Sequence, residues 1–451
     1  MLQKNEIYEA EITGMTNEGS GVCKINGMAV FVPMTAIGDK LKIKIVKVLK
    51  NYAFGIIYEL LAFGTGRVTP DCPVFRQCGG CVFRHVDYQT ELQYKQQFVK
   101  DAFARIGKLN PVFEPILCSE NRNHYRNKAQ YPVAMQDNKL ICGFYAKHSH
   151  RVIAFTDCYL HPEIFQEILN YLLPVLQKAN ISAYDENSHT GELRHIYLRK
   201  GYHSGEIMLC FIVKKSIQKK LNFLSDLQKQ FPDIVSISES VNSEKTNVIM
   251  GQTVKLLAGK NFITDSMCGN QIRISPQSFY QINTAQAEQL YMIAKNYADL
   301  QGNKLLLDLY CGAGTIGLSM ADSVKKLIGV EVIPQAIENA KENAKQNQIF
   351  NTEFYCGDAG MISKKLLTKK ISPDVVILDP PRKGCDNMTI QSVVSMQPNK
   401  IIMISCNPAT CARDSAIFAE NHYITEKVKA VDLFPNTAHV ECVVLLTRNN
   451  R

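Results

Sequence analysis

The C-terminal part of the chain, residues 274–451, predicts a doubly wound α/β domain, and two β-rich regions precede it. Short apolar runs alternate with amphipathic helices from Ser275 onward, which is typical of a parallel sheet covered by helices. Glycine-punctuated strands predict a small OB-like β-barrel over residues 1–60. Residues 61–273 are mixed and strand-rich. We therefore expect three domains in this chain of 451 residues, 46% of which are hydrophobic.

Charge and cysteine content narrow the class of protein. Lys and Arg number 51 against 42 Asp and Glu, a formal net charge of +9 that suits a polyanionic partner. The 15 cysteines are odd in number, and the start MLQKNEIYEAEI lacks the apolar core of a signal peptide. The sequence contains no run of about 18 apolar residues, so it predicts no membrane span. We expect a cytoplasmic monomer whose cysteines serve as ligands, catalyst and core filler rather than as disulfides.

One stretch of the predicted barrel, Lys40–Val48, alternates lysines with apolar residues at the period of a strand. One face should enter the core, and a break in the pattern occurs at Val46. A solvated face and an RNA-binding face are both compatible with this alternation. The outward face should carry Lys40, Lys42, Lys44 and Lys47.

Residues 70–85, PDCPVFRQCGGCVFRH, are dense in cysteine and turn residues. Cys72, Cys78 and Cys81 have C-x5-C-x2-C spacing. Three thiolates in one loop predict a metal or cluster site that needs a fourth ligand, and both zinc and an iron–sulfur cluster suit four thiolates. The downstream candidates for the fourth ligand are Cys118, Cys142, Cys158 and Cys210.

The middle of the chain offers further expectations. Asp87–Ile106 and Ile164–Leu176 have the apolar spacing of helices. Arg122–Lys128 and Leu193–Lys200 interleave basic and aromatic residues. Such stretches can hold phosphates and stack bases, but they are more often ordinary half-exposed strands.

The stretch Leu305–Gly317, LLLDLYCGAGTIG, organises the predicted α/β domain. A short apolar strand leads into a turn with Gly312, Gly314 and Gly317, and a helix follows. Such a turn brings backbone N–H groups and a helix N-terminus close to a ligand. The spacing alone would also suit a dinucleotide.

Two further strand ends refine this prediction. Lys326–Glu331 is a second apolar strand, and its terminal acid Glu331 could hold ribose hydroxyls. Asp374–Pro381, DVVILDPP, is a third, ending in Asp379 and two prolines. This third strand end moves the prediction from NAD toward S-adenosylmethionine.

Cys406 follows the apolar strand Lys400–Ser405 and precedes Asn-Pro, so it belongs at the rim where ligands of open α/β sheets bind. A thiol there can be a nucleophile, although a buried structural cysteine is the usual alternative. A methyltransferase would need such a thiol if its target were C5 of uracil, which is a poor nucleophile. Addition of a thiolate to C6 makes C5 nucleophilic, and a base must later remove the C5 proton. Glu441, at the start of the late strand Val440–Leu446, is the candidate base; the alternative is a surface carboxylate.

Taken together, these motifs resemble the RNA (uracil-5-)-methyltransferase family, specifically bacterial 23S rRNA members with a TRAM domain and a [4Fe–4S] cluster. CPVFRQCGGC resembles the cluster loop, and SPQSFYQIN, LDLYCGAGTIGL, DPPRKG, ISCNPATCARD and HVE follow in the family's order. The resemblance implies a class I methyltransferase fold, Cys158 as the fourth cluster ligand, Cys406 as nucleophile and Glu441 as base. It also implies that residues about 87–110 pack on the catalytic domain. The implied cofactor contacts, in addition to Gly312, are Gln281, Tyr310, Thr315, Glu331, Asp358 and Asp379.

The chain departs from the family pattern at Phe83-Arg84-His85, where Leu-Gln-His usually follows the cluster loop, and Cys411 stands where an apolar residue is usual. We read Cys411 as a packing residue. The alternative function is the same chemistry on the tRNA T-loop; the tRNA enzymes of this family generally lack the barrel and the cluster loop. Methylation of a base amino group would need neither Cys406 nor Glu441. A cluster-bearing RNA-binding or redox protein would leave the S-adenosylmethionine motifs without a role.

Overall fold

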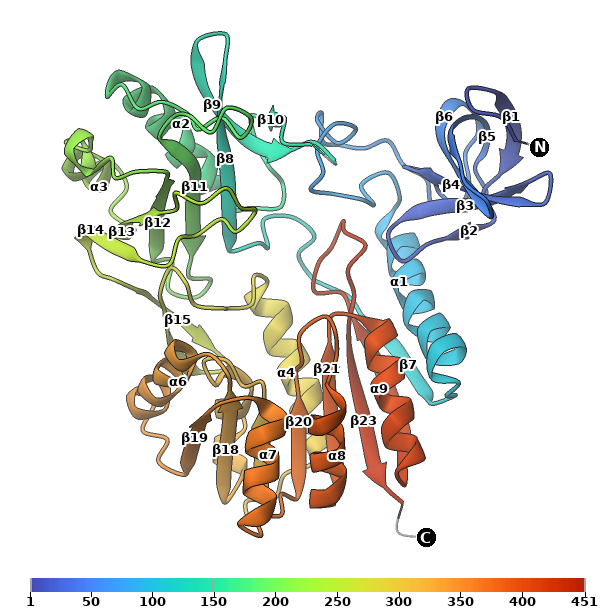
Figure 1. Ribbon diagram of the computed structural model, residues 1–451, viewed down its shortest axis with the longest axis vertical. Coiled ribbons are helices and arrows are strands. Elements are labelled where there is room, and N and C mark those ends of the chain that lie inside the picture. The colour runs from blue at the N-terminus through green and yellow to red at the C-terminus, as the bar shows by residue number, and fades with distance from the viewer. Residues whose placement is uncertain (1, 148, 450–451) are drawn as a thin grey trace.

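The computed structural model describes residues 2–147 and 149–449, in which an eight-stranded, a seven-stranded and a six-stranded sheet form three bodies (Figure 1). A two-stranded hairpin, β15 (Ile263–Met267) and β16 (Asn270–Ile274), accompanies the eight-stranded sheet. In the described residues no helix is long and apolar enough to cross a membrane.

The N-terminal body is a six-stranded sheet in the order β1-β5-β6-β4-β3-β2, built around its own apolar core. Strand β5 covers the predicted Lys40–Val48, and Leu41, Ile43 and Ile45 are fully buried between lysines. The alternation therefore places its apolar face in the core as predicted. The six strands are β1 (Ile7–Glu11), β2 (Gly14–Met15), β3 (Ser20–Ile25), β4 (Met28–Pro33), β5 (Lys40–Val48) and β6 (Tyr52–Ala62).

Residues 70–85, which we call the cysteine loop, lead into helix α1 (Tyr88–Ala102). This helix continues as a π-helical turn over Phe103–Gly107. Asp87 caps the helix, because its carboxylate accepts the Thr90 N–H at 2.7 Å. Val99, Ala102 and Phe103 enter the same core as residues of the C-terminal sheet. The helix therefore packs on the C-terminal body, beside α9 (Pro408–Glu420), although a whole domain separates them in the sequence (Figure 1).

The central body is a seven-stranded sheet in the order β10-β9-β8-β11-β12-β13-β14. Strands β11 and β12 are buried along almost their whole length because α2 and α3 cover the apolar core beside them. Its elements are β8 (Lys128–Gln136), β9 (Lys139–Tyr145), β10 (Val152–Ala154), α2 (Glu163–Lys178), β11 (Leu193–Lys200), β12 (Ile207–Val213), a 3₁₀ turn (Gln218–Lys220), α3 (Leu224–Gln230), β13 (Ile234–Val241) and β14 (Val254–Gly259).

The C-terminal body is an eight-stranded sheet in the order β19-β18-β17-β20-β21-β23-β22-β7, with helices on both faces, which confirms the doubly wound α/β prediction. Strand β23 is antiparallel to both of its neighbours, and β7, from before the central sheet, pairs in parallel with β22 at the edge. The remaining elements are β7 (Val112–Leu117), α4 (Thr284–Ala298), β17 (Leu305–Leu309), α5 (Thr315–Leu318), a 3₁₀ turn (Ala321–Ser323), β18 (Lys326–Glu331), α6 (Pro334–Gln346), β19 (Thr352–Cys356), α7 (Ala359–Thr368), β20 (Val375–Leu378), α8 (Asn387–Met396), β21 (Lys400–Ser405), β22 (Tyr423–Val431) and β23 (Glu441–Arg448).

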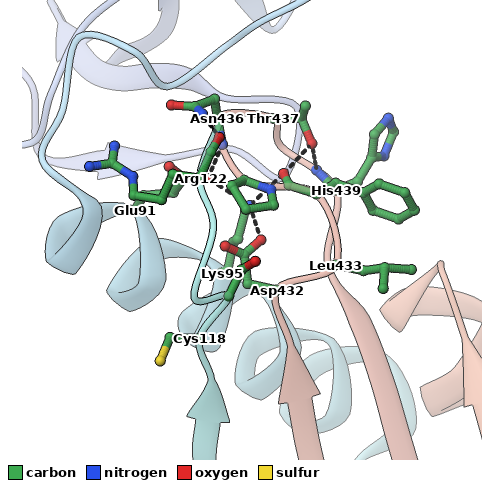
Figure 2. Close-up of polar contacts among 12 residues, drawn as sticks. Glu91, Lys95, Cys118, Arg122, Asp432, Leu433, Asn436, Thr437 and His439 are labelled. Carbon is green, nitrogen blue, oxygen red and sulfur yellow. Dashed lines mark hydrogen bonds and ion pairs between the residues drawn. The ribbon is translucent and has the colours of Figure 1, made fainter. Parts of the chain in front are cut away.

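A fully buried lysine joins α1 to the C-terminal sheet (Figure 2). The Lys95 ammonium donates to the Glu91 carboxylate at 2.7 Å and to the Asp432 carboxylate at 2.6 Å, and all three side chains are inaccessible to solvent. Asp432 directly follows β22. Buried charges are tolerated only when they are paired, so this contact fixes α1 against the sheet.

Replacing Lys95 by Met should lower the free energy of unfolding by about 3–5 kcal/mol, because two carboxylates would remain buried without a cation. Chemical denaturation followed by circular dichroism measures this change. The control is Lys100→Met, on the exposed side of the same helix, which should change stability little. Equal stability of the two variants would contradict the structural role given to Lys95.

Candidate functional site

The site lies at one rim of the C-terminal sheet, where several strand ends meet. Strand β20 ends immediately before Asp379, and β21 ends immediately before Cys406. Strand β23 runs antiparallel to β21, with Ser405 opposite Cys442. Glu441, the first residue of β23, therefore lies beside Cys406 at the same rim.

Each glycine of the turn after β17 has its own role. Gly312 has φ +56°, and a side chain added there would meet nothing within 4 Å, so the backbone borders open space. Gly314 has φ +82° and precedes α5. A Cβ at Gly317 would lie 2.8 Å from an Asp308 carboxylate oxygen, which accepts the Gly317 N–H at 3.0 Å. Glycine is therefore required for conformation at the first two positions and for close packing at the third.

The acid at the end of β18 is oriented by this turn. One Glu331 carboxylate oxygen accepts the Gly312 N–H at 3.2 Å, and the other accepts the Ile333 N–H at 2.9 Å. Tyr310, which has φ +65°, donates its hydroxyl to Thr389 at 3.3 Å. Asp358 is exposed and caps α7 through the Met361 N–H. The structure thus brings Glu331 to the glycine turn, whereas the Asp358 carboxylate serves the helix cap.

Tyr291 of α4 connects two of the predicted cofactor residues, and the sequence analysis missed it. Its hydroxyl lies 3.2 Å from the Thr315 hydroxyl and also hydrogen-bonds the Gln281 side chain. Burial raises the pKa of Tyr291, so the hydroxyl stays protonated. Its position on a buried helix face gave no sequence signal beyond an ordinary core tyrosine.

The titration of the rim carboxylates reflects their burial. Burial raises the pKa of Asp379 to about 7. The pKa of Glu441 is raised to about 8, mainly by burial and secondarily by the charge of Asp379. Burial and then the charges of Glu441 and Asp379 raise the pKa of the Cys406 thiol. A carboxylate with a pKa near neutrality can accept a proton, which is the property required of a general base.

Arg382 is the cation of this group, and the sequence analysis did not single it out within DPPRKG. Its charge opposes the upward pKa shifts of both Cys406 and Glu441, and its side chain hydrogen-bonds the thiol. It also lies 3.1 Å from Nδ1 of His439. The rim therefore combines a thiol, the carboxyls of Asp379 and Glu441 and the guanidinium of Arg382, whereas Cys411 is buried in the core, as predicted.

The cysteine loop borders a cavity of about 420 Å³ between the loop and the central sheet. Cys72, Cys78, Cys81 and Cys158 all line it, whereas Cys118, Cys142 and Cys210 do not. In the described residues no three His, Cys, Asp or Glu side chains are close enough to hold a single metal ion. The four predicted ligand cysteines therefore border one shared cavity.

Cationic groups border the same cavity. Arg84 and Arg126 line it, and Arg84 hydrogen-bonds the Cys81 thiol, which lowers the pKa that burial raises. The Gly80 N–H lies 3.3 Å from the Cys78 sulfur. These donors would stabilise thiolates, the form that binds metal.

The arginines of one of the two basic and aromatic stretches, Leu193–Lys200, lie in the protein interior. Arg194 and Arg199, on β11, are buried. The Arg194 guanidinium donates to backbone carbonyls, including that of Glu244 at 2.9 Å, and Arg199 donates to the Ser278 carbonyl at 2.9 Å. The phosphate-binding interpretation of Leu193–Lys200 is therefore wrong, because these charges satisfy interior backbone groups.

The outer face of the barrel carries both lysines and aromatic rings. Lys42 is paired with Glu59 at 2.8 Å, whereas in the described residues Lys44 and Lys47 have no ion pair. Lys47 is opposite Phe54 on the neighbouring strand. The rings of Phe31, Tyr52 and Phe54 contact one another with centroids 5.5–5.9 Å apart, and the latter two rings are exposed. Such a face can stack bases and contact phosphates.

Comparison with known proteins identifies the family. Residues 87–449 match the family described as tRNA (Uracil-5-)-methyltransferase, and residues 2–58 match the TRAM domain. The chain belongs to the tRNA (uracil-5-)-methyltransferase family. Its members are S-adenosylmethionine-dependent RNA uracil-5 methyltransferases, so the C-terminal sheet is a class I methyltransferase domain behind an N-terminal TRAM domain.

Individual relatives agree over nearly the whole chain. An RNA methyltransferase of Oceanobacillus iheyensis is 42% identical over 99% of this chain and 97% of its own, and one of Clostridium tetani is 40% identical over the same shares. The solved tRNA (uracil-54, C5)-methyltransferase of Pyrococcus abyssi, in complex with S-adenosyl-L-homocysteine, is 27% identical with a TM-score of 0.79. That match covers 97% of this chain and 99% of the other. A tRNA enzyme can therefore share the barrel region, which the sequence analysis had taken to favour rRNA.

The charges around Cys406 predict opposite shifts in two variants. Glu441→Gln should lower the pKa of Cys406, because the carboxylate raises it, and Arg382→Gln should raise it. Since the pKa of Glu441 is about 8, its effect should emerge above that pH, where the carboxylate is charged. The pH profile of iodoacetamide alkylation at Cys406, followed by peptide mass spectrometry, measures both shifts. Glu426→Gln, on β22, is the control; identical profiles for all variants would contradict the described electrostatics.

Proposed function

We propose that this protein methylates C5 of a uracil in 23S rRNA, with Cys406 as nucleophile and Glu441 as the base that removes the C5 proton. The observation that carries the proposal is the meeting of a thiol and a carboxyl whose pKa is about 8 at the rim next to the glycine turn. Membership in a uracil-5 methyltransferase family supports the same chemistry.

The reaction uses these two side chains at different times. The Cys406 thiolate adds to C6 and forms a carbon–sulfur bond, which makes C5 nucleophilic. When bound, S-adenosylmethionine would supply the methyl group: its S–CH3 bond breaks as C5 attacks, and S-adenosyl-L-homocysteine remains. After C5 is methylated, the Glu441 carboxylate takes the C5 proton. The electrons of that C–H bond restore the C5–C6 double bond, and the Cys406 thiolate leaves.

The remaining predicted residues have proposed roles at the same rim. Glu331 would hold ribose hydroxyls, since the turn fixes both of its oxygens toward Gly312 and Ile333. Gln281 and Thr315 meet at the Tyr291 hydroxyl and would border the cofactor. Asp379, whose pKa is raised to about 7 by burial, would position uracil or the cofactor. Tyr310 and Gly312 would form the wall of the pocket. Asp358 uses Oδ1 to cap α7, and its other carboxylate oxygen would accept the adenine amine.

The four cysteines of the central cavity would hold a [4Fe–4S] cluster. Cys72, Cys78, Cys81 and Cys158 line one cavity, and two arginines border it. The methyl transfer moves no net electrons, so the proposed cluster would support folding and RNA binding rather than chemistry.

The second candidate substrate is the tRNA T-loop. The match to a tRNA (uracil-54, C5)-methyltransferase over 97% of this chain supports it. The motif resemblance to rRNA enzymes, including the cysteine loop, supports 23S rRNA. Mapping 5-methyluridine in rRNA and tRNA of a deletion strain decides between them. Loss from 23S rRNA alone is expected, loss from tRNA alone would establish the second candidate, and no loss from either would contradict both.

The roles of Cys406 and Glu441 predict different products from two variants. Cys406→Ala should give neither methylated RNA nor a covalent complex. Glu441→Gln should add and methylate but accumulate a methylated protein–RNA adduct, visible as a slow band on a denaturing gel. Loss of a general base typically slows a step about 100- to 10,000-fold, so some product can still form. Normal turnover of Glu441→Gln would show that another group, such as Asp379, is the base.

Protein purified without oxygen should be brown, with iron and acid-labile sulfide in equal amounts. Cys158→Ser should lose most of this colour, because it removes one of four ligands. Cys142→Ser is the matched control, since Cys142 is a buried cysteine outside the cavity lining. A colourless protein that contains one equivalent of zinc would contradict the cluster.

A further inference from the structure

The loop between β22 and β23, residues 432–440, contacts three parts of the molecule that are distant in sequence. We call it the anchored loop. Val431 pairs with Glu441 across its base, so the proposed catalytic base is the first residue after the loop. The loop therefore leads directly into Glu441, where β23 begins at the rim.

One side of the anchored loop is held by α1 (Figure 2). Besides its two ion pairs, the Lys95 ammonium donates to the Phe434 carbonyl at 3.0 Å. The Glu91 carboxylate accepts the Asn436 N–H at 2.7 Å, and the Tyr88 hydroxyl donates to Asp432 at 2.7 Å. Glu91, Lys95, Asp432 and Asn436 are buried, so water cannot easily replace the bonds that join them.

A second side is held by the cysteine loop and the segment before β8. The Asn436 carbonyl accepts the N–H groups of Val82 at 2.8 Å and Phe83 at 3.1 Å, which directly follow Cys81. The Asn436 side chain donates to the Arg122 carbonyl at 2.9 Å. The Tyr125 hydroxyl donates to the Pro435 carbonyl at 2.9 Å. Asn436 is 1% exposed and has φ +66°, so it is confined in a conformation that few residue types adopt.

The third side faces the rim. The Leu433 carbonyl accepts the side chain of Asn283, the capping residue of α4, at 3.0 Å. The His439 N–H donates to the Thr437 hydroxyl at 3.3 Å, and the His439 ring meets Arg382. The loop thus ends in direct contact with the guanidinium that acts on Cys406 and Glu441.

We propose that the anchored loop is a positioning device that links the cysteine loop to the catalytic base, with Asn436 and Tyr125 as positioning residues. The inference rests on the proposed function. According to this proposal, Val82 and Phe83, which follow Cys81, affect proton removal by Glu441. They act through the two hydrogen bonds that their backbone N–H groups donate to the Asn436 carbonyl. No electron transfer is involved.

The nucleophile is held by other contacts. Cys406 lies between β21 and α9, where the Asn407 side chain donates to the Arg382 carbonyl at 3.0 Å and the Asn407 N–H donates to the Ser405 hydroxyl at 3.1 Å. None of these bonds involves residues 432–440. The loop does reach the thiol through the contact of His439 with Arg382, but neither Tyr125 nor Asn436 makes that contact. Loosening the anchored loop at Tyr125 or Asn436 should therefore slow the step that needs Glu441 more than the step that needs only Cys406.

Tyr125→Phe and Asn436→Gly test this separation. The first removes one hydroxyl bond to Pro435, and the second keeps the positive φ and the backbone bonds but removes the side-chain anchor. Tyr423→Phe is the matched control, because Tyr423 is also a buried tyrosine that donates to a proline carbonyl, Pro398, at 3.0 Å. It lies at the opposite end of β22.

Two rates are measured on whichever transcript the wild type methylates. The first is the rate at which the enzyme is trapped by the same transcript carrying 5-fluorouridine, which reports addition. The second is the rate at which the adduct on unmodified RNA decays, which reports proton removal. We expect both variants to slow the decay of the adduct about tenfold and to keep the rate of trapping within about twofold of wild type. The effect on decay is smaller than the loss of about 100-fold or more expected when a general base is removed altogether. Hydrogen exchange should show faster exchange of the Val82 and Asn436 amides.

The outcomes separate the inference from the proposed function. Absence of trapping in the wild type would refute the proposed chemistry itself. Normal trapping and normal decay in both variants would refute the positioning role alone, as would an equal loss of both rates. Slow decay in Tyr423→Phe as well would also overturn it, because the effect would then be one of general destabilisation.

Discussion

The antiparallel pairing of β23 with β21 is the constraint on which the site depends. Parallel strands end at one rim, but their starts lie at the other, so a residue that begins a parallel strand would be far from Cys406. Because β23 runs in the opposite direction, its first residue reaches the rim where β21 ends. The register of that single strand pair brings together Cys406 and Glu441, the proposed nucleophile and base, which are separated in the sequence by a helix and a strand.

Burial then gives these groups their chemistry. A carboxyl enclosed at the rim is neutral more readily than one in water, so Glu441 can exchange a proton near neutral pH. The same burial holds the thiol in its neutral form until a charge such as Arg382 favours the thiolate. Enclosing uracil would exclude more water from this rim and strengthen each of these interactions.

The sequence predicted most of the catalytic sheet, because buried parallel strands are apolar runs and their ends carry the polar residues. The strands Lys326–Glu331 and Lys400–Ser405 have the predicted bounds. Charged residues that are buried were predicted poorly: Arg194 and Arg199 satisfy interior carbonyls, and Lys95 pairs with a residue of the distant C-terminal sheet. Tyr291, Arg382 and the anchored loop were missed for the same reason, since contacts between remote segments leave no periodic signal. The presence of the barrel does not by itself distinguish rRNA from tRNA as substrate, because the match to the tRNA (uracil-54, C5)-methyltransferase of Pyrococcus abyssi covers 97% of this chain.

The most direct test of the central claim follows the C5 hydrogen itself. RNA carrying tritium at uracil C5 is incubated with S-adenosylmethionine, and tritium released to water is compared with methyl groups incorporated. The account predicts that the two amounts are equal for the wild type and that Glu441→Gln incorporates methyl while releasing much less tritium. Methyl incorporation by the wild type with full retention of tritium would contradict the account, because the methyl group would then be on another atom.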